Sequence, residues 1–188
     1  MKLTISVHYF FEQYLPRIKG YGPNTIKAYR DAFSLFLPFA RDTLGMPINS
    51  LQLEQLTPEL IVDFLGWLEK ERGNSARTRN HRLAAIQALA KMILYKHPEK
   101  EDIAKKILNI PCKRYHRNII GFLNQVEILV VLESVNIKSA QGFRDYTILN
   151  LLFDSGARAS EVATLDLDYF NPQQKSLVIL GKGGHFRM

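Results

Sequence analysis

The spacing of apolar side chains is the feature that most restricts how this chain can fold. Through residues 1–97, apolar positions recur at steps of three and four, which places them on one face of an α-helix. Breaks rich in Gly and Pro divide this pattern into stretches over residues 5–18, 24–44, 57–72 and 75–95. Thr57 followed by Pro58 is typical of a helix start, with Thr57 as the N-cap. We therefore predict a bundle of four or five helices over residues 1–97.

The chain changes character after residue 97. Residues 99–108 predict a short helix, and residues 111–117 contain basic residues and no acidic one. We interpret residues 98–121 as a basic linker between two domains. Asn124 and Glu127 then form a capping-box pattern for a helix over residues 125–134.

A second apolar helix is predicted over residues 144–154, followed by a short strand over residues 176–180 and a glycine-rich turn at residues 181–184. These elements predict an incomplete α+β domain with a short β-hairpin over residues 122–188. The fold class of the whole chain is mainly α.

Basic charge is concentrated on the fourth predicted helix. The chain has 25 Lys and Arg against 18 Asp and Glu, and this net charge of +7 favours a polyanionic partner such as nucleic acid. Residues 75–97 contain several Lys and Arg and no acidic residue, whereas residues 57–72 are rich in acids. Three arginines stand at the N-terminal end of the fourth helix, where the helix dipole favours acids instead. Contact with DNA phosphates would explain this placement.

The helix starts therefore supply the candidate DNA-binding residues. Arg and Asn also suit the guanine and adenine edges in the major groove. The candidates on the fourth helix are Arg77, Thr78, Arg79, Asn80 and Arg82. The second helix adds Asn24, Thr25, Lys27 and Arg30, and the linker adds Lys113, Arg114 and Arg117. The alternative is a solvated basic face on which Ser75 and Thr78 only cap the helix.

Two short motifs stand in the last third of the chain. Gly156-Ala157-Arg158-Ala159-Ser160-Glu161-Val162 follows the apolar helix, and Gly156 suits the residue just past a helix end. Gly181-Lys182-Gly183 lies at the hairpin turn, 24 residues after Arg158 by sequence number. Considered alone, Arg158 could be a helix-start arginine paired with Glu161, and Lys182 an ordinary turn lysine.

Taken together, these motifs resemble the tyrosine recombinases of the phage integrase family, including the Xer-like proteins. Residues 122–128 resemble the first helix of the family's catalytic domain, and residues 156–165 resemble the segment with its first catalytic arginine. Residues 24–29 and 75–83 resemble the second and fourth helices of the family's core-binding, SAM-like domain, which enter the major groove. The resemblance covers nearly the whole chain.

The resemblance implies DNA integration and recombination, as in a mobile element, by transesterification that needs no cofactor and no metal. In this chemistry a tyrosine attacks a DNA phosphodiester. Arg158 would bind the non-bridging oxygens with two N–H groups. Lys182 would act as general acid for the leaving 5′-oxygen. Glu161 would orient Arg158.

The sequence also departs from the family pattern. The family's His-x-x-Arg motif and nucleophilic tyrosine follow the hairpin, whereas this sequence ends at Met188. We assign none of its eight tyrosines as the nucleophile and expect no strand cleavage from the chain as it stands. The alternative is a truncated, non-enzymatic DNA-binding module that occupies recombination sites or regulates a full-length relative. A third interpretation, a purely structural bundle, predicts no salt-dependent DNA binding.

Double-stranded DNA is the expected partner. Self-association or a full-length recombinase is a further candidate, because apolar residues near 149–153 are expected to be partly exposed. We expect no membrane partner, since no apolar run reaches the ~18 residues of a membrane span. Residues 1–8 carry no signal-peptide pattern, and the single cysteine, Cys112, excludes an internal disulfide. We expect a cytoplasmic location.

Overall fold

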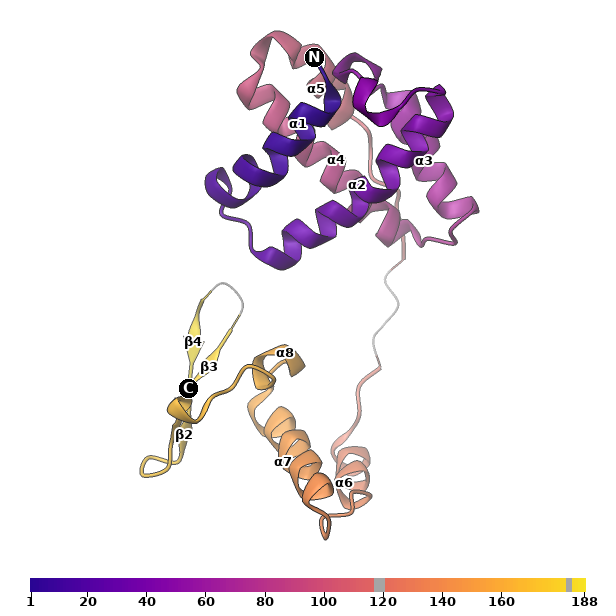
Figure 1. The fold of residues 1–188 in the computed structure, drawn as a ribbon. Coiled ribbons are helices and arrows are strands. Elements are labelled where there is room, and N and C mark those ends of the chain that lie inside the picture. Colours follow the sequence, from indigo (N-terminus) through magenta and orange to yellow (C-terminus); the bar gives the residue numbers. More distant parts are fainter. Residues whose placement is uncertain (117–120, 182–183) are drawn as a thin grey trace. The chain divides into compact units, whose positions relative to one another are not determined.

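The computed structural model describes residues 1–116, 121–181 and 184–188. The chain divides into two compact units, Met1–Arg117 and Asn118–Met188 (Figure 1).

The first unit is built from helices. α1 (Leu3–Tyr9) continues directly into a π-helical segment, η1 (Phe10–Ile18), where one helix was predicted. The helices that follow are α2 (Pro23–Leu44), α3 (Pro58–Lys70), α4 (Ala76–Lys96) and α5 (Glu101–Leu108). Short 3-10 segments lie between them at Ile48–Ser50, Leu53–Gln55 and Pro98–Lys100. The predicted helical bundle is confirmed.

Local sequence signals set the ends of these helices. Thr57 caps α3 as predicted, because its Oγ1 accepts a hydrogen bond from the backbone N–H three residues later, at 3.3 Å. Ser75 caps α4 in the same way, also at 3.3 Å. Gly45 ends α2 in the left-handed conformation, with φ at 63°. α2 begins at Pro23, slightly earlier than predicted, because a proline in the first turn forfeits no helical hydrogen bond.

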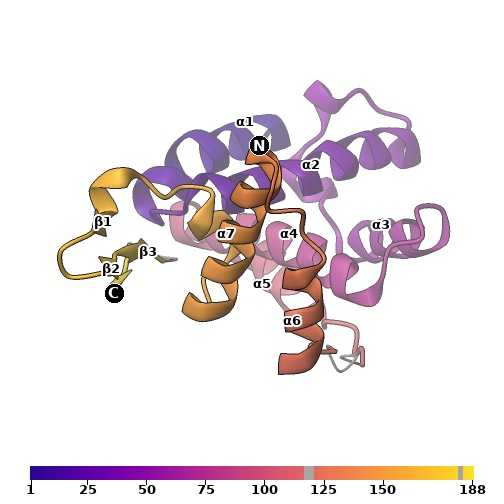
Figure 2. The same cartoon turned by 90° about the horizontal axis from the view of Figure 1, so that it is seen from below.

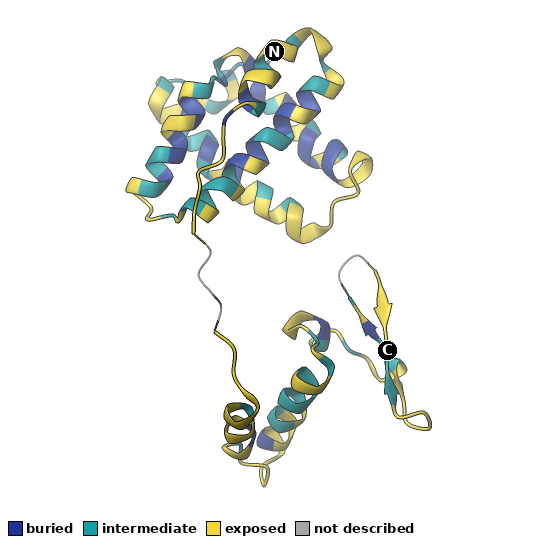
Figure 3. Cartoon of the chain, turned by 180° about the vertical axis from the view of Figure 1, so that it is seen from behind, coloured by how far each residue is buried: buried dark blue, intermediate teal, exposed yellow. Residues whose placement is uncertain are grey.

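α4 is the central helix of the first unit and contacts α2, α3 and α5 (Figure 2). Its Leu83, Ile86 and Ile93 are fully buried. Phe36 of α2 meets Phe64 of α3 edge to face, with 5.1 Å between the ring centroids. Figure 3 shows buried positions recurring along the helices of this unit. This core fixes the N-terminal ends of α2 and α4, which carry most of the candidate DNA-binding residues.

The first unit extends beyond residue 97, into the segment interpreted from sequence as a linker. Ala104 and Ile107 of α5 are fully buried, and Ile110 is 6% exposed. Ala104 and Ile107 join the same core as α4 because they lie on one apolar stripe of an otherwise charged helix, and Ile110 joins it just past the end of α5. Only from Pro111 onward is the segment continuously exposed, through the described residue His116.

The second unit combines short helices with two small strand pairs. Its helices are α6 (Gln125–Glu133), α7 (Ala140–Ser155) and α8 (Ala159–Val162), and a 3-10 segment follows at Leu167–Tyr169. β1 (Phe170–Asn171) pairs antiparallel with β2 (Ser176–Leu177), and β3 (Ile179–Leu180) pairs antiparallel with β4 (Phe186–Arg187). The capping box of Asn124 and Glu127 is confirmed, with hydrogen bonds of 3.0 and 2.7 Å.

Two predicted boundaries in the second unit were wrong. α7 begins at Ala140 rather than near residue 144, because Ser139 caps it by accepting the Gly142 N–H at 3.0 Å. The single predicted strand over residues 176–180 is two strands. Its first half pairs backward with β1 and its second half pairs forward with β4.

Much of the apolar surface of the second unit is exposed (Figure 3). Val126 is 70% exposed, Phe143 62% and Phe153 46%. The predicted partial exposure near residues 149–153 is confirmed. Among the residues described, no helix has both the length and the apolar character that crossing a membrane requires.

Candidate functional site

The starts of α2 and α4 form the first candidate site. Arg77 is exposed in the first turn of α4, and Lys27 is exposed near the start of α2, together with Asn24 and Thr25. The two helix starts are joined by Arg82, whose Nη1 donates to the Ala28 carbonyl oxygen at 3.2 Å. Two surfaces that the sequence could only place on separate helices are thereby brought together.

Arg79 is engaged inside the bundle. Its side chain is only 12% exposed, and its Nε lies 3.7 Å from Oε2 of Glu69 on α3. Its Nη1 also donates to Oδ1 of Asn80 at 3.2 Å. Arg79 therefore lies beside a carboxylate of the neighbouring helix, in contrast to the exposed Arg77 one half-turn before it.

Asn80 is bound to the backbone of Lys113. Its Nδ2 donates to the Lys113 carbonyl oxygen at 2.7 Å, and its Oδ1 accepts the Lys113 N–H at 2.9 Å. The ammonium group of Lys113 forms an ion pair with Glu69 at 2.8 Å. Both polar ends of Asn80 are thus occupied by the chain segment that follows α5.

The remaining candidates differ in their surroundings. Arg30 forms an exposed ion pair with Glu12 at 3.2 Å and lies over the Phe11 ring. The hydroxyl of Thr78 lies 3.1 Å from that of Ser75. Arg114 is exposed. Arg117, also predicted to bind DNA, lies outside the described residues.

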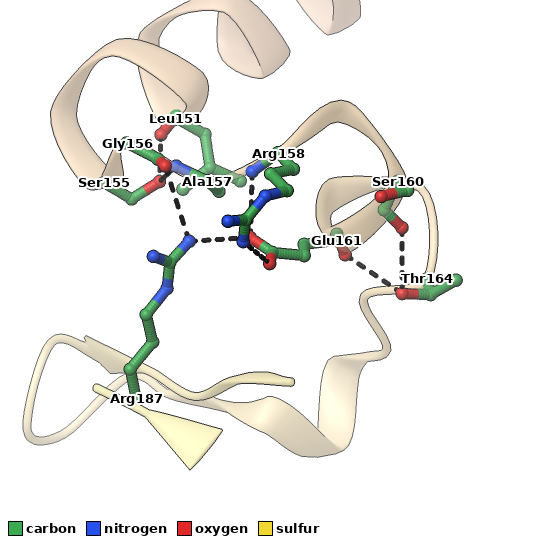
Figure 4. Close-up of polar contacts among 9 residues, drawn as sticks. All are labelled: Leu151, Ser155, Gly156, Ala157, Arg158, Ser160, Glu161, Thr164 and Arg187. Atoms are coloured by element: carbon green, nitrogen blue, oxygen red, sulfur yellow. Dashed lines mark hydrogen bonds and ion pairs between the residues drawn. The ribbon is translucent and has the colours of Figure 1, made fainter. Parts of the chain in front are cut away.

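The second candidate site lies where α7 ends and α8 begins. Gly156, with φ at 58°, ends α7 in the left-handed conformation that favours glycine. The Arg158 N–H then donates to Oε2 of Glu161 at 2.9 Å, and the Arg158 Nη1 donates to Oε1 at 2.8 Å (Figure 4). The Glu161 side chain is 5% exposed, whereas that of Arg158 is 66% exposed. A buried carboxylate therefore orients a guanidinium that remains open to solvent.

A second guanidinium, from Arg187 in β4, binds the same carboxylate. Its Nη2 donates to Oε2 of Glu161 at 2.6 Å and to the Gly156 carbonyl oxygen at 3.4 Å (Figure 4). Arg187 is not among the site residues predicted from the sequence. The available signal was weak, a second basic side chain in the return strand two residues after His185.

Charge and hydrogen bonding at Glu161 favour its ionised form. Its pKa is lowered, first by the hydrogen bond from the Arg158 backbone, then by the Arg158 guanidinium, with a smaller contribution from the charge of Arg187. Gly181 lets the two sides of the hairpin lie close together, because a Cβ there would lie 3.2 Å from the His185 carbonyl oxygen, whereas its 3.7 Å distance from Oε1 of Glu161 would be an ordinary contact. Lys182, the predicted general acid, lies outside the described residues.

One carboxylate facing two guanidiniums leaves a net positive charge at this site. The exposed N–H groups of Arg158 are suited to binding an oxyanion such as phosphate. The local chain pattern explains why Arg158 and Glu161 meet: a glycine helix end, an N-cap arginine and a glutamate at the third helical position.

Comparisons with known proteins point to one family. Residues 10–96 match the family model described as phage integrase, N-terminal SAM-like domain. The chain is 35% identical to the integrase/recombinase y4rC of Sinorhizobium fredii over 175 residues, which are 93% of this chain and 53% of the relative. It is 34% identical to y4rD of the same organism, covering 95% of this chain and 64% of the relative.

A tyrosine recombinase XerC of Leptospira interrogans is 26% identical, over 92% of this chain and 53% of the relative. The chain thus spans between about half and two thirds of the length of these relatives.

Proposed function

We propose that this chain, which belongs to the phage integrase family of tyrosine recombinases, binds double-stranded DNA in site-specific recombination or integration. The contact is made by the first turns of α2 and α4. The observation that carries the proposal is the junction between these helix starts, where Arg82 of α4 bonds to the Ala28 carbonyl oxygen of α2, while Lys27 and Arg77 on the same two helix starts are exposed.

Charge and helix geometry favour phosphate binding at these helix starts. The N-terminal end of a helix carries a partial positive charge and unpaired N–H groups, so it attracts phosphate. Exposed arginine and lysine at the same ends add full charges that the helix dipole itself does not favour. An α-helix fits the major groove of B-DNA, where Asn24 and Thr25 could contact base edges while the cations bind the backbone.

The second unit contributes a phosphate-binding cation to the proposed function. Arg158 binds the non-bridging oxygens of the reacting phosphodiester, and Glu161 holds the guanidinium in place. In the complete family reaction, Lys182 would protonate the leaving 5′-oxygen as a tyrosine attacks the phosphorus, a step that needs a nucleophile beyond those assigned here. For these 188 residues the proposal is DNA binding and phosphate positioning, and it assigns none of their eight tyrosines as a nucleophile.

Salt-dependent DNA binding tests the proposal. The affinity of the 188-residue chain for a fluorescent duplex is measured by anisotropy at several salt concentrations. We expect the logarithm of the association constant to fall linearly with the logarithm of salt concentration, with a slope of about −0.9 per phosphate contacted. An affinity that does not depend on salt would contradict the proposal.

Arg77→Glu and Lys91→Glu form a matched pair for this measurement. Both reverse one exposed charge on α4, but position 91 lies about 21 Å further along the helix, from a rise of 1.5 Å per residue. We expect Arg77→Glu to weaken binding at least ~10-fold and Lys91→Glu to weaken it much less. Equal losses would mean that net charge, not the start of α4, controls binding.

A further inference from the structure

Side-chain amides of α4 hold the chain segment that leaves α5. Gln87 Nε2 donates to the carbonyl oxygens of Leu108 and Ile110, at 3.2 and 3.0 Å. Two helical turns earlier, Asn80 pairs with both the N–H and the carbonyl oxygen of Lys113. Residues 108–113 are therefore attached along one face of α4, toward its N-terminal end.

The pairing of Asn80 with Lys113 is specific to an amide side chain. It requires a donor and an acceptor on one planar group, matched to the N–H and C=O of one residue. While this pairing persists, the donor–acceptor edge of the Asn80 amide is occupied by Lys113 and cannot at the same time pair with an adenine edge. Asn80 therefore serves a different purpose from the one that its position on α4 predicts.

Neighbouring cations near the pairing of Asn80 with Lys113 have different surroundings. Glu69 pairs with Lys113 at 2.8 Å and lies 3.7 Å from Arg79, so a single carboxylate holds both cations against the bundle. The next residue, Arg114, is exposed. Arg114 lines the same surface hollow as Asn80, together with Cys112, Lys113, Tyr115 and His116.

We infer that Asn80 is a positioning residue for DNA binding. Its two hydrogen bonds to the Lys113 backbone fix Arg114 beside the start of α4, where Arg114 contacts a DNA phosphate. Gln87 secures the other end of the same segment. The inference rests on the proposed DNA binding and adds to it a defined role for the first residues after α5.

Hydrogen exchange of the Lys113 amide, measured without DNA, tests whether Asn80 holds the Lys113 backbone. In Asn80→Ala this amide loses its acceptor, and we expect it to exchange about 10-fold faster, as the loss of one hydrogen bond implies. Asn80→Asp keeps the accepting oxygen and should retain most of the protection. His81→Ala, at the exposed neighbouring position on α4, should leave the Lys113 amide unchanged. The amides of Ile86 and Ala90, in the middle of α4, report whether the bundle stays folded.

A double-mutant comparison tests the placement of Arg114. In the otherwise unchanged chain, Arg114→Ala should reduce the size of the salt slope by about 0.9, the share of one phosphate contact. In the Asn80→Ala background, Arg114→Ala should change the slope little further, because Arg114 is no longer held in place.

Each result decides one part of the inference. An unchanged exchange rate of the Lys113 amide in Asn80→Ala would show that Asn80 does not hold the Lys113 backbone. Equal effects of Arg114→Ala on the salt slope in both backgrounds would show that Asn80 does not position Arg114. A changed preference among duplex sequences with Lys113 exchange unaltered would assign Asn80 to base reading instead. A chain with no DNA affinity would refute the proposed function and the phosphate contact of Arg114. The exchange measurement would still show whether Asn80 holds the Lys113 backbone.

Discussion

At the scale of single residues, similar side chains in this chain have different surroundings. Arg77 and Arg79 lie two residues apart on α4, yet Arg77 is exposed and Arg79 is 12% exposed beside Glu69. Arg77→Ala should weaken DNA binding and change the free energy of unfolding by less than ~0.5 kcal/mol. Arg79→Ala should lower the free energy of unfolding by about 1 kcal/mol, because it removes a partner of a partly buried carboxylate. Urea unfolding followed by the fluorescence of Trp67, the only tryptophan in the sequence, measures the free energy of unfolding of both variants. Equal stability of both variants would contradict this assignment.

Glu161 offers a residue-scale test at the second candidate site, where α7 ends and α8 begins. Its pKa is lowered in the folded chain, so it stabilises the fold above its unfolded pKa of ~4.3 and loses this contribution as pH falls through the lower folded value. The backbone N–H of Arg158 donates to Glu161, so its chemical shift reports this titration. We expect a midpoint below ~4.3 in the wild-type chain, a higher midpoint in Arg187→Gln and no such titration in Glu161→Gln.

Glu133→Gln, which alters an exposed carboxyl of the same unit, is the control for this titration and should leave the midpoint unchanged. A wild-type midpoint at the ordinary glutamate value would mean that the carboxylate does not hold the two guanidiniums in solution.

At the scale of secondary-structure elements, the helix caps connect the sequence to the candidate DNA surface. Ser75 caps the end of α4 that carries Arg77. Ser75→Ala should lower the free energy of unfolding by about 1 kcal/mol and fray the first turn of α4. Ser34→Ala is the matched control, since its exposed hydroxyl bonds to the Asp31 carbonyl oxygen within α2 and caps no helix end. Urea unfolding at Trp67 measures both variants, and equal stabilities would argue against the cap.

The elements also mark how far the sequence could predict the fold. Caps and apolar stripes are local signals, so Thr57, Asn124 and the helices of the first unit could be predicted. The burial of Ile107 could not, because a stripe this short on a charged helix is also compatible with an exposed linker. Residues 176–180 show a single strand pattern in the sequence. They form two strands because β2 pairs with β1 whereas β3 pairs with β4.

The candidate sites were predictable to a similar extent. Arg158 and Glu161 are three residues apart and could be paired from sequence. Arg187 meets Glu161 from 26 residues away, through a hairpin whose placement no local pattern specifies. The sequence likewise placed Asn80 correctly on α4 but could not reveal that its amide faces Lys113.

At the scale of the whole molecule, the two units differ in how much apolar surface they bury. The first unit has a large buried core, whereas Leu132 and Ile179 are the buried apolar residues among those described in the second. We expect amides of α4 to exchange at least ~100-fold more slowly than those of α6, because exchange follows local stability. Hydrogen exchange of the complete chain measures this, and equal protection of the two helices would contradict it.

The central claim is that the starts of α2 and α4 form one DNA-binding surface. Its most direct test is a titration of the isotopically labelled chain with a short duplex, followed through backbone amide chemical shifts. We predict that the largest changes in the first unit fall on residues 24–30, 75–82 and 113–114. Changes centred instead on α1 or α3, with residues 24–30 and 75–82 unaffected, would contradict the claim.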